Sequence, residues 1–177
     1  VQMLDGVEVR RFNYFVPRRQ ALCYRSGMLP NLKQSRVLWF QVPFYLANLF
    51  ASVLRAVRTE SIDVINAHWV VPQGIVTRLV QSLSSVPVVL TVHGGDIFAF
   101  QGLVGRFLKR VALKSADACT ANSAFTRSQL LQLCPEADVS IVPMGVDVAE
   151  FEPGQRCFSL RQELGIKAEM ILFVGRL

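Results

Sequence analysis

Residues 87–96 read PVVLTVHGGD, and this stretch decides the fold. Residues 87–92 are a continuous apolar and β-branched run, which is typical of a strand buried on both faces in a parallel sheet. His93, Gly94, Gly95 and Asp96 follow directly, where such a strand ends. Because ligands bind beyond the carboxyl ends of parallel strands, these four residues are the first candidates for a functional site.

Short apolar runs like this one recur along the chain and alternate with helical patterns. Strands are predicted over residues 7–15, 63–67, 87–92, 117–121, 139–142 and 170–174. Helical patterns cover 74–83 and 103–113, and a third begins at Ser123, a good N-cap residue. This alternation predicts an α/β fold with a Rossmann-like, doubly wound and mostly parallel sheet.

Two apolar segments need a closer reading. In residues 103–113 the apolar side chains of Leu103 and Phe107 fall on one helical face, with Arg106 and Lys109 on the other.

Residues 37–57 are apolar enough for a membrane span, but four polar residues share one helical stripe: Gln41, Asn48, Ser52 and Arg55. A helix begun at Pro43 and ended at 57 would be only about 22 Å long, against a hydrocarbon core of about 30 Å. We therefore expect a structural helix that is buried or lies at an interface.

The chain carries a net charge of +6, from 19 basic and 13 acidic residues, and the charge is unevenly placed. Between Val9 and Thr59 there is no acid, and nine basic residues occur: Arg10, Arg11, Arg18, Arg19, Arg25, Lys33, Arg36, Arg55 and Arg58. Such a surface attracts phosphate groups, although a merely solvated basic face is the alternative. The bases are not interleaved with aromatics in a recognisable nucleic-acid module, so we expect no nucleic-acid partner.

The four cysteines stand at 23, 119, 134 and 157, with no CxxC pair, and the sequence has only two histidines. This pattern predicts no metal site. The cysteines have apolar neighbours, as reduced core thiols do, which indicates a reducing compartment such as the cytoplasm.

Both histidines lie at the ends of predicted strands. His68 and Trp69 follow residues 63–67, and His93 follows residues 87–92. His93 can donate or accept a hydrogen bond near neutral pH, and Asp96 can orient a sugar hydroxyl. The alternative for each is structural: His68 and His93 as satisfied strand-end residues, and Asp96 as a helix cap.

Two further strand ends carry weaker candidates. Asn122 and Ser123 follow residues 117–121, where helix capping alone would explain them. Gly175 and Arg176 follow residues 170–174, and a guanidinium there could grip a diphosphate with two hydrogen bonds. The sequence has no GxGxxG after a strand, no GxxxxGK[ST] and no GxSxG, which argues against dinucleotide, P-loop and hydrolase-elbow sites.

Taken in order, five segments resemble the family 4 retaining glycosyltransferases of GT-B fold. They are DVINAHWVVPQG (63–74), VVLTVHGGD (88–96), ADACTANSAFTRSQL (116–130), VSIVPMGVDVAEFEP (139–153) and ILFVGRL (171–177). The resemblance covers roughly residues 61–177. It implies that residues 1–153 are the acceptor-side, Rossmann-like domain of a GT-B fold without its first strand, and that 154–177 are a linker and the first strand of the donor-binding domain.

The resemblance also implies an activity and a set of residues. Such enzymes are hexosyl-type transferases that move a sugar from a nucleotide-sugar donor to a sugar or lipid-linked acceptor, with retention and without cofactor or metal. His93 would face the transferred sugar, with Asp96 supporting it. Gly175 and Arg176 would contact the donor diphosphate. The acceptor side would comprise His68, Trp69, Gly94, Gly95, Asn122 and Ser123.

The chain also departs from the family pattern. Asn66 stands where the family often has His. The family's first strand and its Gly-rich loop would precede Val1, so we expect a sheet one strand short. We also expect residues 1–177 alone to show negligible transfer, because Arg176 is the only donor-binding group among them.

Two other functions remain open on the sequence. One is a Rossmann-like binding module that docks on an anionic membrane or a partner, because the basic, acid-free stretch adjoins an apolar helix. It is compatible with transfer at the cytoplasmic membrane surface. The other is a sugar-nucleotide epimerase of GT-B fold, which would share the architecture but should lack this ordered set of HGGD and GVD motifs.

Overall fold

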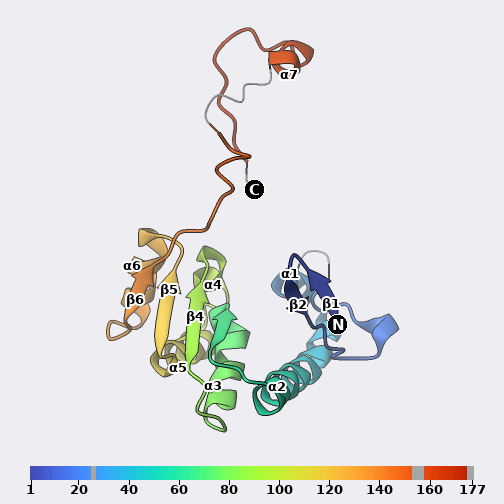
Figure 1. Cartoon of the computed structure of the whole chain (residues 1–177), viewed down its shortest axis with the longest axis vertical. Coiled ribbons are helices and arrows are strands. Elements are labelled where there is room, and N and C mark those ends of the chain that lie inside the picture. The colour runs from blue at the N-terminus through green and yellow to red at the C-terminus, as the bar shows by residue number, and fades with distance from the viewer. Residues whose placement is uncertain (25–26, 153–157, 175–177) are drawn as a thin grey trace. The chain divides into compact units, whose positions relative to one another are not determined.

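The computed structural model describes residues 1–24, 27–152 and 158–174. The chain divides into two compact units, Val1–Pro143 and Met144–Leu177 (Figure 1). The second unit contains one described helix, α7 (Phe158–Glu163). Gly175 and Arg176, the donor-side candidates, lie outside the described residues. That 154–177 opens a donor-binding domain stays a prediction.

The first unit is built on a four-stranded parallel sheet, which confirms the α/β, Rossmann-like class (Figure 1). Its strands stand in the order β3 (Ile65–His68), β4 (Val88–Val92), β5 (Ala118–Ala121) and β6 (Val139–Ile141). Leu90 of β4 is in register with Ala67 on one side and Cys119 on the other. Four of the six predicted strands are therefore found, each within about two residues of its expected ends.

Helices connect these strands in chain order. They are α3 (Ile75–Gln81), α4 (Gly94–Phe98), α5 (Leu103–Ser115) and α6 (Ala124–Leu133), with a single turn, η3 (Val70–Gly74), ahead of α3. Before the sheet come short turns and two more helices: η1 (Pro17–Arg19), α1 (Met28–Gln34), η2 (Arg36–Phe40) and α2 (Gln41–Thr59). Parallel neighbours need such crossovers, which place each site loop at the same edge of the sheet.

The core lies on one face of the sheet. Along β4, Val88, Leu90 and Val92 are at most 3% exposed, whereas the alternate residues are only half-buried. On that second face the Thr91 hydroxyl donates to Asn66 Oδ1 at 2.9 Å, and the Thr120 hydroxyl donates to Thr91 Oγ1 at 3.1 Å. The expectation that β4 is buried on both faces is wrong, because this second face carries a polar ladder.

Two predicted strands are not found as expected. Of residues 7–15 only Val7–Val9 form a strand, β2, which pairs antiparallel with β1 (Gln2–Leu4) in a separate hairpin. Residues 170–174 form no strand, and Ile171 is fully exposed. A strand needs a neighbour to satisfy its backbone groups, and no described strand lies beside this segment.

Helix α2 starts two residues before Pro43, which stands in the first turn, where proline is tolerated. The expected helix exists and is longer than residues 43–57. Only Gln41 and Tyr45 of it are buried, and Tyr45 packs in a small apolar cluster with Tyr14, Leu22 and Leu32. Gln41 donates to the Arg19 carbonyl at 2.8 Å and accepts from the Ala21 N–H. Among the described helices, the stretch Arg36–Thr59 is long and apolar enough to cross a membrane by length and composition.

Helix α5 is turned the opposite way from the face that its sequence favours. Leu103 and Phe107 are 88% and 64% exposed, whereas Lys109 is only 3% exposed. Gly105 explains the rotation: a Cβ there would lie 1.8 Å from the Phe100 carbonyl oxygen, so only glycine permits this close contact. The face that packs inward combines this close contact with the apolar side chains of Ala112 and Leu113, which lie in the core.

Candidate active site

The two histidines of the chain meet at the carboxyl ends of β3 and β4. His68 is the last residue of β3, and His93 directly follows β4. Because β3 and β4 are parallel neighbours with His68 in register with Thr91, the two rings lie side by side. His68 Nδ1 and His93 Nε2 are 3.0 Å apart, and the ring planes are 15° apart with centroids at 5.2 Å.

This contact joins the two rings by one hydrogen bond, so one nitrogen donates and the other accepts. Which ring donates depends on the tautomer. His68 is exposed and His93 is half-buried. The pair can therefore present either a donor or an acceptor to a ligand at this edge, and it fixes the orientation of the His93 ring.

Asp96 connects the loop back to the strand end. It is 2% exposed and is the third residue of α4. Its Oδ2 accepts a hydrogen bond from the His93 N–H at 2.9 Å. Asp96 thus caps α4 from inside the first turn and does not occupy the N-cap position, because the helix begins at Gly94, immediately after the strand. Its Oδ1 is buried and accepts no hydrogen bond from the described protein atoms.

Burial raises the pKa of Asp96 to about 6. The backbone amides of His93 and Val70, and the positive charges of Lys109 and His68, oppose this rise in pKa. The carboxyl is therefore ionised at neutral pH but titrates close to the physiological range. This places a pH-sensitive group directly behind His93.

Trp69 stands beside this pair in a strained backbone conformation. Its φ is 79°, which is unusual for a bulky residue, and its side chain is 41% exposed. A Cβ added at Gly95 would lie 3.8 Å from the Trp69 ring, so the indole lies next to the HGGD loop. Gly94 and Gly95 are not in the left-handed region. The glycines therefore have ordinary backbone angles, and their assignment to the acceptor side stays a prediction.

Asn122 and Ser123 reach the same edge after β5, but the side-chain oxygen of each is already hydrogen-bonded to Thr126. The Ser123 hydroxyl accepts from the Thr126 N–H at 3.1 Å, which confirms it as the N-cap of α6. Asn122 Oδ1 accepts from the Thr126 hydroxyl at 2.8 Å. Their assignment to the acceptor side stays a prediction, and the geometry favours capping.

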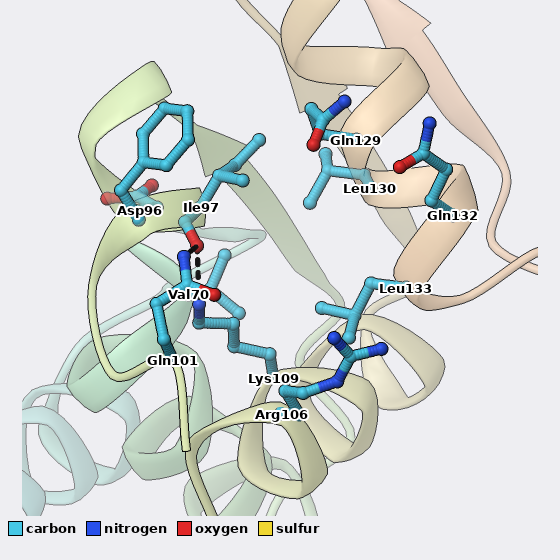
Figure 2. Close-up of a pocket in the computed structure, with 11 residues that line it drawn as sticks. Val70, Asp96, Ile97, Gln101, Arg106, Lys109, Gln129, Leu130, Gln132 and Leu133 are labelled. Atoms are coloured by element: carbon cyan, nitrogen blue, oxygen red, sulfur yellow. Dashed lines mark hydrogen bonds between the residues drawn. The ribbon is translucent and has the colours of Figure 1, made fainter. Parts of the chain in front are cut away.

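A cavity of about 230 Å³ adjoins the loop, between α4, α5 and α6 (Figure 2). Arg106 and Lys109 of α5, with Gln129 and Gln132 of α6, supply its polar lining. The sequence pattern predicts Lys109 on the solvent face, so it does not predict that Lys109 is buried beside this cavity. The available signal was the spacing of Gly105 and Ala112, small residues that mark the packed stripe on which Lys109 lies. No cluster of three metal-ligating side chains occurs in the part of the chain that the structure describes.

Comparison with known proteins finds one matching family and several similar proteins. Residues 5–150 match the model of Glycosyltransferase Family 4. An uncharacterized glycosyltransferase of Methanocaldococcus jannaschii is 30% identical over 103 residues, covering 58% of this chain and 28% of its own length.

Two further relatives are similar over longer stretches. A putative teichuronic acid biosynthesis glycosyltransferase of Bacillus subtilis is 26% identical over 72% of this chain. A D-inositol 3-phosphate glycosyltransferase of Acidothermus cellulolyticus is 31% identical over 77% of this chain. In both cases the match covers 34% of the relative, so the chain spans about a third of the length of these proteins.

Proposed function

Because the chain belongs to glycosyltransferase family 4, we propose that its protein transfers a sugar, of hexosyl type, from a nucleotide-sugar donor to an acceptor. The observation that carries this proposal is the meeting of His68, Trp69, His93 and Asp96 at one edge of a parallel sheet. Ligands of such sheets bind at this edge. In the proposal the described residues form the acceptor side of the site.

Each of these side chains suits a role in sugar binding. His93 can hydrogen-bond a hydroxyl of the transferred sugar while His68 holds its ring in place. Trp69 offers an exposed aromatic face on which the apolar side of an acceptor sugar can pack. Asp96 keeps His93 at the strand end through the backbone hydrogen bond.

We propose that transfer proceeds with retention of the anomeric configuration. Asp96 is not placed to form a covalent intermediate, since it is 2% exposed and bonded to backbone. The acceptor hydroxyl would instead attack the face that the diphosphate leaves, and its proton would pass to the departing phosphate oxygen. A new C–O bond forms as the old one breaks, so the atoms and charges of the reaction balance without a cofactor or metal.

The acceptor we propose is a hydroxyl-rich compound, a sugar or a lipid-linked sugar. One relative is named for teichuronic acid biosynthesis and another for D-inositol 3-phosphate. Residues 9–59 of the chain are basic and free of acids, which suits an acceptor that carries negative charge.

The test is a screen of nucleotide sugars with the full-length protein, measuring nucleoside diphosphate release with and without candidate acceptors. We expect one donor to be turned over by the wild type, and His93→Ala to retain the fold by circular dichroism while losing turnover. Wild-type rates in His93→Ala would overturn the assignment of the site. No turnover of any donor by the full-length protein would overturn the proposed activity.

A second candidate function is docking on the cytoplasmic membrane surface, with which transfer to a lipid-linked acceptor is compatible. Its support is a segment of the chain, residues 15–44, in which exposed apolar and basic side chains are frequent: Val16, Val37, Trp39, Phe40, Phe44, Arg18, Arg19, Lys33 and Arg36. Phe15, Phe40 and Phe44 contact one another with ring centroids 5.3 to 6.1 Å apart, yet Phe40 is 64% exposed. Apolar side chains combined with basic residues are typical of segments that bind at a membrane interface.

Vesicle flotation of the full-length protein tests this second function. Four cations near an anionic surface contribute about 1 kcal/mol each, so binding should require anionic lipid and weaken with salt. Trp39→Ala combined with Phe40→Ala should reduce flotation, whereas Leu79→Ala, which removes an equally exposed apolar side chain on α3, should not. Equal binding to neutral and anionic vesicles would contradict the proposal, as would full flotation of the double variant.

A further inference from the structure

Helix α5 buries a lysine while it exposes a phenylalanine, and this reversal needs a cause. Lys109 is 3% exposed, whereas Phe107, two residues earlier, is 64% exposed. Removing an ammonium from water is costly unless hydrogen bonds and an opposite charge compensate it. The surroundings of Lys109 show what that compensation is.

The first partner of Lys109 is the last turn of α4. Its Nζ donates to the Ile97 carbonyl at 2.7 Å, and Gln101 Nε2 donates to the same oxygen at 2.8 Å (Figure 2). Helix α4 has only five residues, so its end carbonyls have few partners of their own. Lys109 thereby fastens α5 to the short helix that begins with the HGGD loop.

The second partner is the charge of Asp96, which adjoins Ile97. The groups that face this carboxyl are Lys109 from α5, His68 from β3 and the His93 amide at its own helix start. Burial lowers the pKa of Lys109, the charge of Asp96 opposes this fall, and the charge of Arg106 adds to it. Among these groups, Lys109 is the one that α5 contributes, and its positive charge lowers the pKa of Asp96. It stabilises the ionised form of Asp96 in a site that burial disfavours.

We infer that Lys109 is a positioning residue of the candidate active site, which holds the end of α4, and with it the Asp96 side chain, in place so that His93 stays at the end of β4. The chain of contacts runs from Lys109 through Ile97 and Asp96 to the His93 N–H. The role in sugar transfer rests on the proposed function. The coupling between Lys109 and Asp96 does not, and it can be measured without a substrate.

The experiment follows the Asp96 carboxyl by ¹³C NMR in the full-length protein labelled at aspartate, with Asp96→Asn to assign the signal. Lys109→Met keeps the length of the side chain and removes its charge. We expect the titration midpoint of Asp96 to rise by about one pH unit or more in this variant, because an opposite charge near a buried carboxyl is lost. Lys109→Arg should restore the wild-type midpoint. Arg110→Met, an exposed cation on the same helix, should leave it unchanged.

The second readout is the pH profile of donor turnover, with the nucleotide sugar that the screen identifies. The acid limb of kcat should move upward together with the Asp96 midpoint in Lys109→Met and return in Lys109→Arg. A merely structural lysine would change stability but not this limb. If the methionine variant does not fold, Lys109→Gln removes the charge with a polar side chain and serves the same comparison.

An Asp96 midpoint that is the same in the charge-removed variant as in the wild type would overturn the inference. A midpoint that moves while the acid limb of kcat stays fixed would overturn the positioning role. If no nucleotide sugar is turned over by the wild type, the proposed function fails, and the NMR result still decides whether Lys109 and Asp96 are coupled.

Discussion

Replacing Asp96 by asparagine should change how the stability of the protein depends on pH. Burial raises the pKa of Asp96 in the folded chain to about 6, against an ordinary value of 3.8. A carboxyl with a raised folded pKa contributes most stability below its unfolded pKa, and loses that contribution as the pH rises through the folded pKa. The difference of roughly 2 units corresponds to about 3 kcal/mol, of which about 2 kcal/mol is lost between pH 4.5 and 7.5.

The assay is urea unfolding of the wild-type and Asp96→Asn proteins at pH 4.5 and 7.5, followed by circular dichroism. The asparagine also leaves a buried amide to be satisfied, but that cost is the same at both pH values and cancels in the comparison. We expect the variant to gain stability relative to the wild type as the pH rises. The difference in free energy of unfolding, variant minus wild type, should increase by about 2 kcal/mol from pH 4.5 to 7.5. A relative stability that stays constant across this range would refute the reasoning.

Four other substitutions test separate contacts. His93→Ala should lower kcat by about 10²- to 10³-fold with little change in melting temperature, since it removes the hydrogen bond proposed to orient the transferred sugar; the donor-release assay measures this. Trp69→Ala should raise KM for the acceptor more than it lowers kcat, because an exposed aromatic contributes binding area, and initial rates at varied acceptor concentration will show it. Gly105→Ala should lower the free energy of unfolding by about 1 to 3 kcal/mol or more, since its Cβ would meet the Phe100 carbonyl oxygen; an unchanged urea midpoint would contradict this. Ser123→Ala should cost about 1 kcal/mol through loss of the α6 N-cap, measured by the same unfolding assay.

The sheet could be predicted from sequence because its signals are local. Residues 87–92 and the three similar runs are short, apolar and bounded by turn residues, and each forms a strand where expected. Residues 170–174 have the same composition but no neighbouring strand among the described residues. A strand pattern indicates which residues suit a sheet, whereas the pairing of a strand depends on a second strand next to it.

The residues of the candidate site were likewise predictable only in part. His68 and His93 were expected at strand ends, and the parallel register of β3 and β4 brings their rings to within hydrogen-bonding distance. Lys109 could not be found from hydrophobic periodicity, because the buried face of α5 is the one that holds Gly105, Lys109, Ala112 and Leu113. The expected roles of Gly175 and Arg176 fall outside the described residues and remain predictions.

The most direct test of the proposed activity is the anomeric configuration of the first product. The full-length protein would be incubated with an α-linked nucleotide sugar and its acceptor, and the anomeric proton coupling of the new linkage followed by ¹H NMR from the start of turnover. Transfer with retention should give an α-linked product whose formation depends on His93. A β-linked first product, or an α-linked product formed equally fast by His93→Ala, would contradict the account.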